Sequence, residues 1–135
     1  MTYDEKKAWL GRYEQAKKKE LYLLREFREA KSSCSHITQI LSPTPGGSSD
    51  GQSLPRAVER VEKARQELSA QELFCDDLHA EIMAMLLALD DPDDYEVLNL
   101  RYLRFQNWES IAGEMKICLR QAYRRHHRAI DALDL

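Results

Sequence analysis

The chain has 135 residues, a net charge of −3 and only five Gly and four Pro, so it suits one domain with an appended arm and favours long helices. No stretch approaches the roughly 20 apolar residues of a membrane span, and the N-terminus lacks the apolar run of a signal peptide. Three widely separated cysteines, Cys34, Cys75 and Cys118, match no metal-binding spacing and read as reduced thiols. We therefore expect a cytoplasmic, all-α protein with no cofactor, no metal and no membrane partner.

Two long stretches place apolar residues at alternating spacings of four and three, the pattern of helices that pack side by side. The first seam consists of Trp9, Tyr13, Ala16, Glu20, Leu23, Phe27, Ala30, Cys34, Ile37 and Leu41, and the second of Val61, Ala64, Leu68, Gln71, Cys75, Leu78, Ile82, Met85 and Leu89. Residues 42–53 between them are rich in Ser, Gly and Pro and favour a flexible loop. The simplest structure is a long antiparallel, coiled-coil-like hairpin over residues 1–90. The alternative is a homodimer in which each seam pairs with the same seam of a second copy.

An acidic segment, residues 90–94 (DDPDD), marks the boundary to a second domain over residues 91–135. Asp91 suits a helix N-cap and Pro92 suits the first helical position, while the following carboxylates favour the positive end of the helix dipole. Because the segment lacks the spacing of a calcium loop, we interpret it as a helix start.

Three short helices are expected in the second domain: Tyr95 to about Arg104, Trp108–Met115 with Asn107 as its cap, and Leu119 to about Leu133. A three-residue turn, Lys116–Cys118, joins the last two. A short helix, a tight turn and a longer basic helix form the helix-turn-helix pattern, whose last helix lies in the DNA major groove.

The expected last helix has two different faces. Ala122, His126, Ala129 and Leu133 form one stripe, which we expect to pack inward, with His126 packed or hydrogen-bonded. The opposite face carries Arg120, Gln121, Arg124, His127 and Arg128. From Lys116 to Ile130 there are five Lys or Arg and no Asp or Glu, although the whole chain is acidic. This local change from negative to positive charge favours the binding of a polyanion such as DNA. The alternative is that the helix only presents a solvated basic face on an ordinary helical bundle.

These segments carry a family resemblance. The stretches LNLRY (98–102), WESIA (108–112) and RQAYR (120–124), followed by His126 and RAI (128–130), resemble region 4 of sigma-70-type transcription factors. More closely, they resemble small phage-encoded sigma-like regulators of the RinA/ArpU type, and the long helices and Ser/Pro/Gly-rich break extend the resemblance over nearly the whole chain. It implies a phage or prophage transcriptional regulator in the bacterial cytoplasm, with double-stranded DNA and bacterial RNA polymerase as partners. In two departures, Lys116 stands where a Gly often makes the turn, and Cys118 stands where a Ser usually caps the recognition helix.

The predicted site residues follow from their positions on this helix. Arg120, Gln121 and Arg124 lie early on it and are expected to contact bases, and Lys116, Arg125, His127 and Arg128 are expected to hold phosphates. Since no catalytic motif is recognised, we expect no enzyme. Two other function classes stay open. One is a DNA-packaging module in the manner of a terminase small subunit, which would form rings. The other is a coiled-coil interaction protein, in which the last helix only packs.

Overall fold

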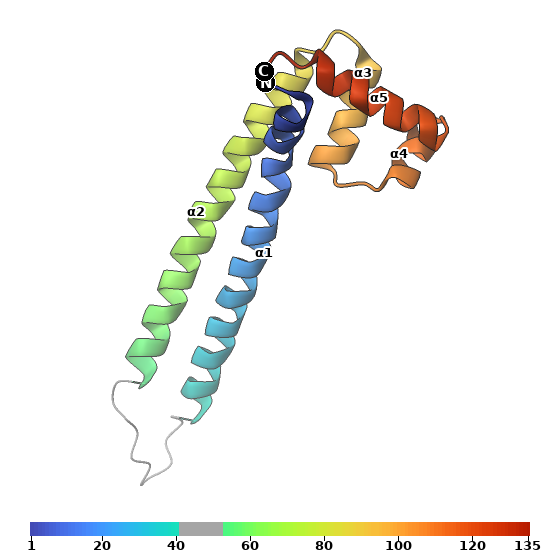
Figure 1. The fold of residues 1–135 in the computed structure, drawn as a ribbon. Coiled ribbons are helices and arrows are strands. Elements are labelled where there is room, and N and C mark those ends of the chain that lie inside the picture. The colour runs from blue at the N-terminus through green and yellow to red at the C-terminus, as the bar shows by residue number, and fades with distance from the viewer. Residues whose placement is uncertain (41–52) are drawn as a thin grey trace. The chain divides into compact units, whose positions relative to one another are not determined.

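A computed structural model describes residues 1–40 and 53–135, and within these ranges every regular element is a helix. The elements are α1 (Tyr3–Ile40), α2 (Ser53–Leu87), α3 (Pro92–Leu98), the π-helical segment η1 (Asn99–Leu103), α4 (Trp108–Met115) and α5 (Leu119–Ala132), as shown in Figure 1. The all-α class and the long N-terminal helix are confirmed. None of the helices in the described ranges has the length and apolarity needed to cross a membrane. The predicted loop 42–53 ended one residue too late, because Ser53 already belongs to α2, and its residues 42–52 lie outside the described part of the chain.

The two predicted seams are confirmed by burial. Every seam position from Trp9 to Ile37 and from Val61 to Leu89 is buried or half-buried, whereas Leu41 lies outside the described residues. Contacts between the first turns of α1 and the last turns of α2 show that these ends run antiparallel. The Arg12 and Glu81 side chains form an ion pair at 3.3 Å, and the rings of Tyr13 and His79 lie 5.4 Å apart. At these contacts the seams therefore pair within one chain.

By their internal contacts, the described residues form two compact units. One consists of the described residues 18–40 and 53–74, which are the C-terminal part of α1 and the N-terminal part of α2 and run side by side in opposite directions (Figure 1). The other combines residues 1–17 with residues 75–135, and it contains the first turns of α1, the end of α2 and all of the shorter helices.

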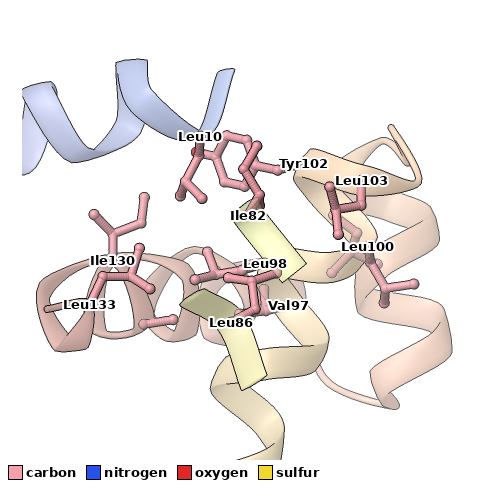
Figure 2. Close-up of a cluster of buried hydrophobic side chains, with 12 residues drawn as sticks. Leu10, Ile82, Leu86, Val97, Leu98, Leu100, Tyr102, Leu103, Ile130 and Leu133 are labelled. Atoms are coloured by element: carbon pink, nitrogen blue, oxygen red, sulfur yellow. The ribbon is translucent and has the colours of Figure 1, made fainter. Parts of the chain in front are cut away.

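The core of this second unit draws on both ends of the sequence (Figure 2). Leu10 of α1 and Ile82 and Leu86 of α2 are completely buried. They share one cluster with residues of α3, η1, α4 and α5: Val97, Leu98, Leu100, Tyr102, Leu103, Ile111, Ala129, Ile130 and Leu133. Burying one such aliphatic side chain stabilises a fold by about 1.5–3 kcal/mol. A boundary drawn at residue 90 thus separates residues that share a core.

The acidic boundary segment acts as a helix start, as predicted. Asp91 Oδ1 accepts a hydrogen bond from the Asp93 backbone N–H at 2.9 Å, and Pro92 occupies the first helical position. The helix predicted from Tyr95 therefore begins three residues earlier, at Pro92. Its last part is η1, where the Arg104 N–H donates to the Asn99 carbonyl at 3.0 Å, one residue further back than in an α-helix.

The turn between α4 and α5 forms without a glycine. Asn107 Oδ1 accepts from the Ser110 N–H at 2.8 Å and caps α4 as predicted. At the other end, Lys116 takes the left-handed conformation, with φ 57° and ψ 44°. The Ile117 N–H donates to the Ala112 carbonyl at 3.0 Å, so that the turn closes as a Schellman motif. A lysine here costs roughly 1 kcal/mol of backbone strain that a glycine avoids.

Candidate functional site

The stripe predicted to face inward on α5 does so. Ala122, His126, Ala129 and Leu133 are all at least 95% buried, and Ile130 joins them. The predicted outer positions Arg120, Gln121, Arg124, His127 and Arg128 are all exposed. The amphipathic pattern therefore predicted correctly which side of α5 packs against the core and which side is exposed.

His126 holds α5 against its neighbours. Its Nε2 lies 2.7 Å from the Tyr102 hydroxyl and its Nδ1 lies 3.4 Å from the Tyr3 hydroxyl, while the Trp108 ring stands edge-on at 4.9 Å. Burial, helped by the positive charges of Lys7 and Arg101, lowers the pKa of His126 to about 4. The neutral imidazole thus joins three aromatic side chains and sets the orientation of α5. This confirms the prediction that His126 is packed or hydrogen-bonded.

The C-terminal end of α5 is capped by a residue from the start of the chain. Lys6 Nζ donates to the Leu133 carbonyl at 2.7 Å and to the Asp131 carbonyl at 3.2 Å. A cation at this end of a helix also interacts favourably with the helix dipole. The pairing joins positions more than 120 residues apart, and the sequence gives no signal for it.

At its N-terminal end, α5 has Cys118 at the N-cap, the position expected from the sequence, and the Gln121 side chain reaches back to it. Gln121 Oε1 accepts a hydrogen bond from the Cys118 backbone N–H at 3.1 Å, which is one half of a capping box. The carbonyl oxygen of Gln121 is thus already engaged, although its side chain is exposed. The predicted contact of Gln121 with a base stays a prediction, and its amide N–H groups are what it has left to offer a partner.

Two of the predicted phosphate-binding arginines are paired with the acidic segment. Asp91 Oδ2 accepts from Arg128 Nη2 at 2.6 Å and from Arg125 Nη1 at 3.1 Å, and Arg125 Nη2 lies 3.4 Å from Asp93 Oδ2. The Asp93 N–H, with Arg125 and Arg128, lowers the pKa of Asp91 and keeps it charged. Asp94 is buried beside them, and this burial raises its pKa. Because of these pairs, part of the positive charge of α5 is neutralised within the chain.

His127 also has a partner within the chain. Its Nδ1 lies 3.1 Å from Asp131 Oδ2, and its ring stacks on Tyr3 with centroids 4.2 Å apart. The side chain remains exposed on the outer face, so a phosphate contact from it stays a prediction.

Three of the predicted residues are exposed and unpaired. Within the described ranges, the side chains of Lys116, Arg120 and Arg124 form no hydrogen bond or ion pair. They occupy the turn and the first two turns of α5. Arg124 also lines a shallow hollow of about 230 Å³ together with Ile117, Gln121, Arg125 and Arg128. A guanidinium group can donate two parallel hydrogen bonds to a phosphate or to a guanine edge.

Two apolar residues beside these arginines were missed by the sequence analysis. Leu119 is 40% exposed and Tyr123 is 48% exposed, and the Tyr123 ring rests on Trp108 at 4.7 Å. Arg101 covers the same Trp108 ring at 4.8 Å. Their spacing of four residues along a helix, with each of them followed directly by an arginine, was the available signal.

The site is thus a basic helix face with three unpaired cations at its N-terminal end, two arginines held by carboxylates and an apolar edge. Among the described residues there is no group of three or more His, Cys, Asp or Glu side chains that could hold a metal ion. Comparison with protein families, with curated proteins and with solved structures finds no match to this chain.

Proposed function

We propose that this protein is a sequence-specific DNA-binding regulator whose α5 helix enters the major groove. The observation that carries the proposal is the outward, unpaired placement of Arg120 and Arg124 in the first two turns of a helix whose other face is locked into the core. In helix-turn-helix proteins, the N-terminal residues of the second helix contact base edges. The three-residue turn between α4 and α5 supports the same assignment.

The charges suggest how the contacts divide. Arg120 and Arg124 are the base-reading candidates, since arginine matches the O6 and N7 acceptors of guanine. Lys116, at the turn, suits a phosphate of the flanking backbone. Arg125 and Arg128 would bind phosphates after giving up their ion pairs with Asp91. His127 would bind a phosphate near the C-terminal end of α5.

We further propose, from the sequence resemblance, that the regulator belongs to a phage or prophage and acts beside bacterial RNA polymerase in the manner of sigma region 4. In this proposal α5 selects a promoter element, and another surface of the chain meets the polymerase. The residues of that second contact are left open.

Selection of bound duplexes from a random DNA pool tests the proposal. The parent chain should enrich one motif, and the Arg120→Ala/Arg124→Ala variant should lose it, at a cost of about 1–3 kcal/mol for each base contact. The matched control is Lys18→Ala/Lys63→Ala, which removes two positive charges from exposed positions of α1 and α2. It should keep the motif, because neither of these lysines belongs to α5 or to the turn before it.

The outcomes separate the proposal from its rivals. Equal enrichment by the parent and the Arg120/Arg124 variant would refute the role of α5. If the folded parent enriches no motif, the selection is repeated with RNA polymerase present, and failure there as well would refute sequence-specific binding. Particles of eight or more copies would favour a packaging protein. DNA binding that is absent or insensitive to salt would favour an interaction protein, since phosphate neutralisation makes affinity fall steeply with salt.

A further inference from the structure

The apolar edge formed by Leu119 and Tyr123 lies beside the unpaired arginines. Leu119 and Tyr123 are four residues apart and follow one side of α5, next to Arg120 and Arg124 respectively. Both side chains are large, and they are 40% and 48% exposed, although Ala122 and His126 on the same helix are buried. Two large apolar side chains are therefore open to a partner at the start of the basic helix.

The Tyr123 ring is held in place rather than free to turn. Trp108 supports it at a centroid distance of 4.7 Å, with the two rings tilted by 54°. Trp108 is fixed in turn by the Arg101 guanidinium on its face and by the His126 ring against it. A supported aromatic side chain loses little conformational entropy when a partner covers it, so it is suited to contact.

We propose that Leu119 and Tyr123 read the C5-methyl groups of thymines next to the bases that Arg120 and Arg124 contact. This inference rests on the proposed function and adds a base identity to it. The methyl group is the only apolar feature that a base pair presents in the major groove, and it is recognised by apolar side chains. The neighbouring unpaired arginines select DNA as the occupant of this edge, because a polyanion brought to Arg120 and Arg124 covers Leu119 and Tyr123 as well.

Deoxyuridine substitution tests the contact directly, because it removes only the methyl group and keeps every hydrogen-bonding group of the base. Each thymine of the duplex selected by the parent chain is replaced in turn by deoxyuridine, and affinity is measured by fluorescence anisotropy at one salt concentration. At one or two thymines, the parent should bind about three- to fivefold more weakly after the replacement.

Three variants show which side chain is responsible for the loss of affinity. At one of the sensitive positions, the Tyr123→Ser or the Leu119→Ala chain should have the same affinity for the thymine duplex and the deoxyuridine duplex. The Tyr123→Phe chain should still bind the thymine duplex more tightly. Arg124→Ala is the matched control, which should bind more weakly overall and still discriminate. Circular dichroism confirms that each variant is folded, and since both substituted side chains are partly exposed, the fold should be retained.

The results distinguish this inference from the function on which it rests. A parent that enriches a motif but has the same affinity for thymine and deoxyuridine at every position overturns the thymine contact and leaves DNA binding intact. A motif without thymine, or a Tyr123→Ser/Leu119→Ala chain that still discriminates, overturns it too. A parent that enriches no motif, alone or with polymerase, overturns the proposed function itself and the inference with it.

Discussion

Between pH 7 and pH 5, the free energy of unfolding should fall by about 2 kcal/mol because of one side chain, His126. Burial among Tyr102, Tyr3 and Trp108 lowers its pKa to about 4, against an ordinary value of 6.5. Well above pH 6.5 the imidazole is neutral in both the folded and the unfolded chain, so it contributes no pH dependence there. Between the two pKa values, only the unfolded chain binds the proton, and stability is lost as the pH falls.

The magnitude follows from the difference between the two pKa values. A difference of about 2.5 pH units corresponds to roughly 3 kcal/mol when the full range down to pH 4 is crossed. About two thirds of this loss falls between pH 7 and pH 5, a window in which most carboxyl groups remain ionised in both states. Asp94, whose pKa burial raises, is present in both the parent and the His126→Gln chain, so the comparison of these two chains isolates the histidine.

Chemical denaturation at pH 7 and pH 5 measures the effect. His126→Gln should lose most of the pH dependence, because the amide does not titrate and can still bond to the Tyr102 hydroxyl. His36→Gln, at an exposed position of α1, is the control and should keep the dependence of the parent chain. A parent chain that loses less than about 0.5 kcal/mol, or a His126→Gln chain with the same slope, would refute the reasoning.

Three further substitutions have expected outcomes of their own. Lys116→Gly should raise the free energy of unfolding by about 0.5–1 kcal/mol, because a glycine takes the left-handed conformation without strain. Lys6→Gln should lower it by about 1 kcal/mol, because the C-terminal carbonyls of α5 lose their cation. Asp91→Asn keeps a helix-capping side chain while removing the carboxylate closest to Arg125 and Arg128, so it should raise DNA affinity and steepen the salt dependence by about one phosphate contact.

Each of these three predictions has a control variant or a result that would contradict it. Lys116→Ala shares the loss of charge with Lys116→Gly but keeps the strain, so equal stabilities of the two variants would remove the strain argument. Lys7→Gln removes an exposed lysine from the next position and should leave stability nearly unchanged. For Asp91→Asn, an unchanged affinity and salt slope in DNA titrations would mean that Arg125 and Arg128 do not exchange their carboxylate for phosphate.

The features predicted correctly from the sequence depend on neighbours a few residues apart. The two seams, the caps at Asp91 and Asn107 and the buried stripe of α5 all follow from spacings of two to four residues. These patterns report local conformation and burial, because the helix period brings such residues onto one face.

Apart from the exposed residues Leu119 and Tyr123, the features that were missed depend on residues far apart in the chain. Leu10 enters the core of the C-terminal helices, Lys6 caps α5, and Asp91 holds Arg128, over separations of 37 residues or more. A periodic pattern shows that a helix has an apolar or basic face but does not identify what meets it. The unpaired positive charge on α5 is consequently smaller than the sequence predicts, because Arg125 and Arg128 are paired with Asp91.

The shared core of residues 1–17 and 75–135 also sets an order of events during synthesis. A ribosome releases Leu10 long before it has made Ile130 and Leu133, so the first turns of α1 emerge with their apolar side chains uncovered. These contacts close a loop of more than 100 residues, which makes them slow to form. The contacts of this core with Ile130 and Leu133 therefore form only after translation has reached α5, and the apolar surface that they cover favours aggregation until then.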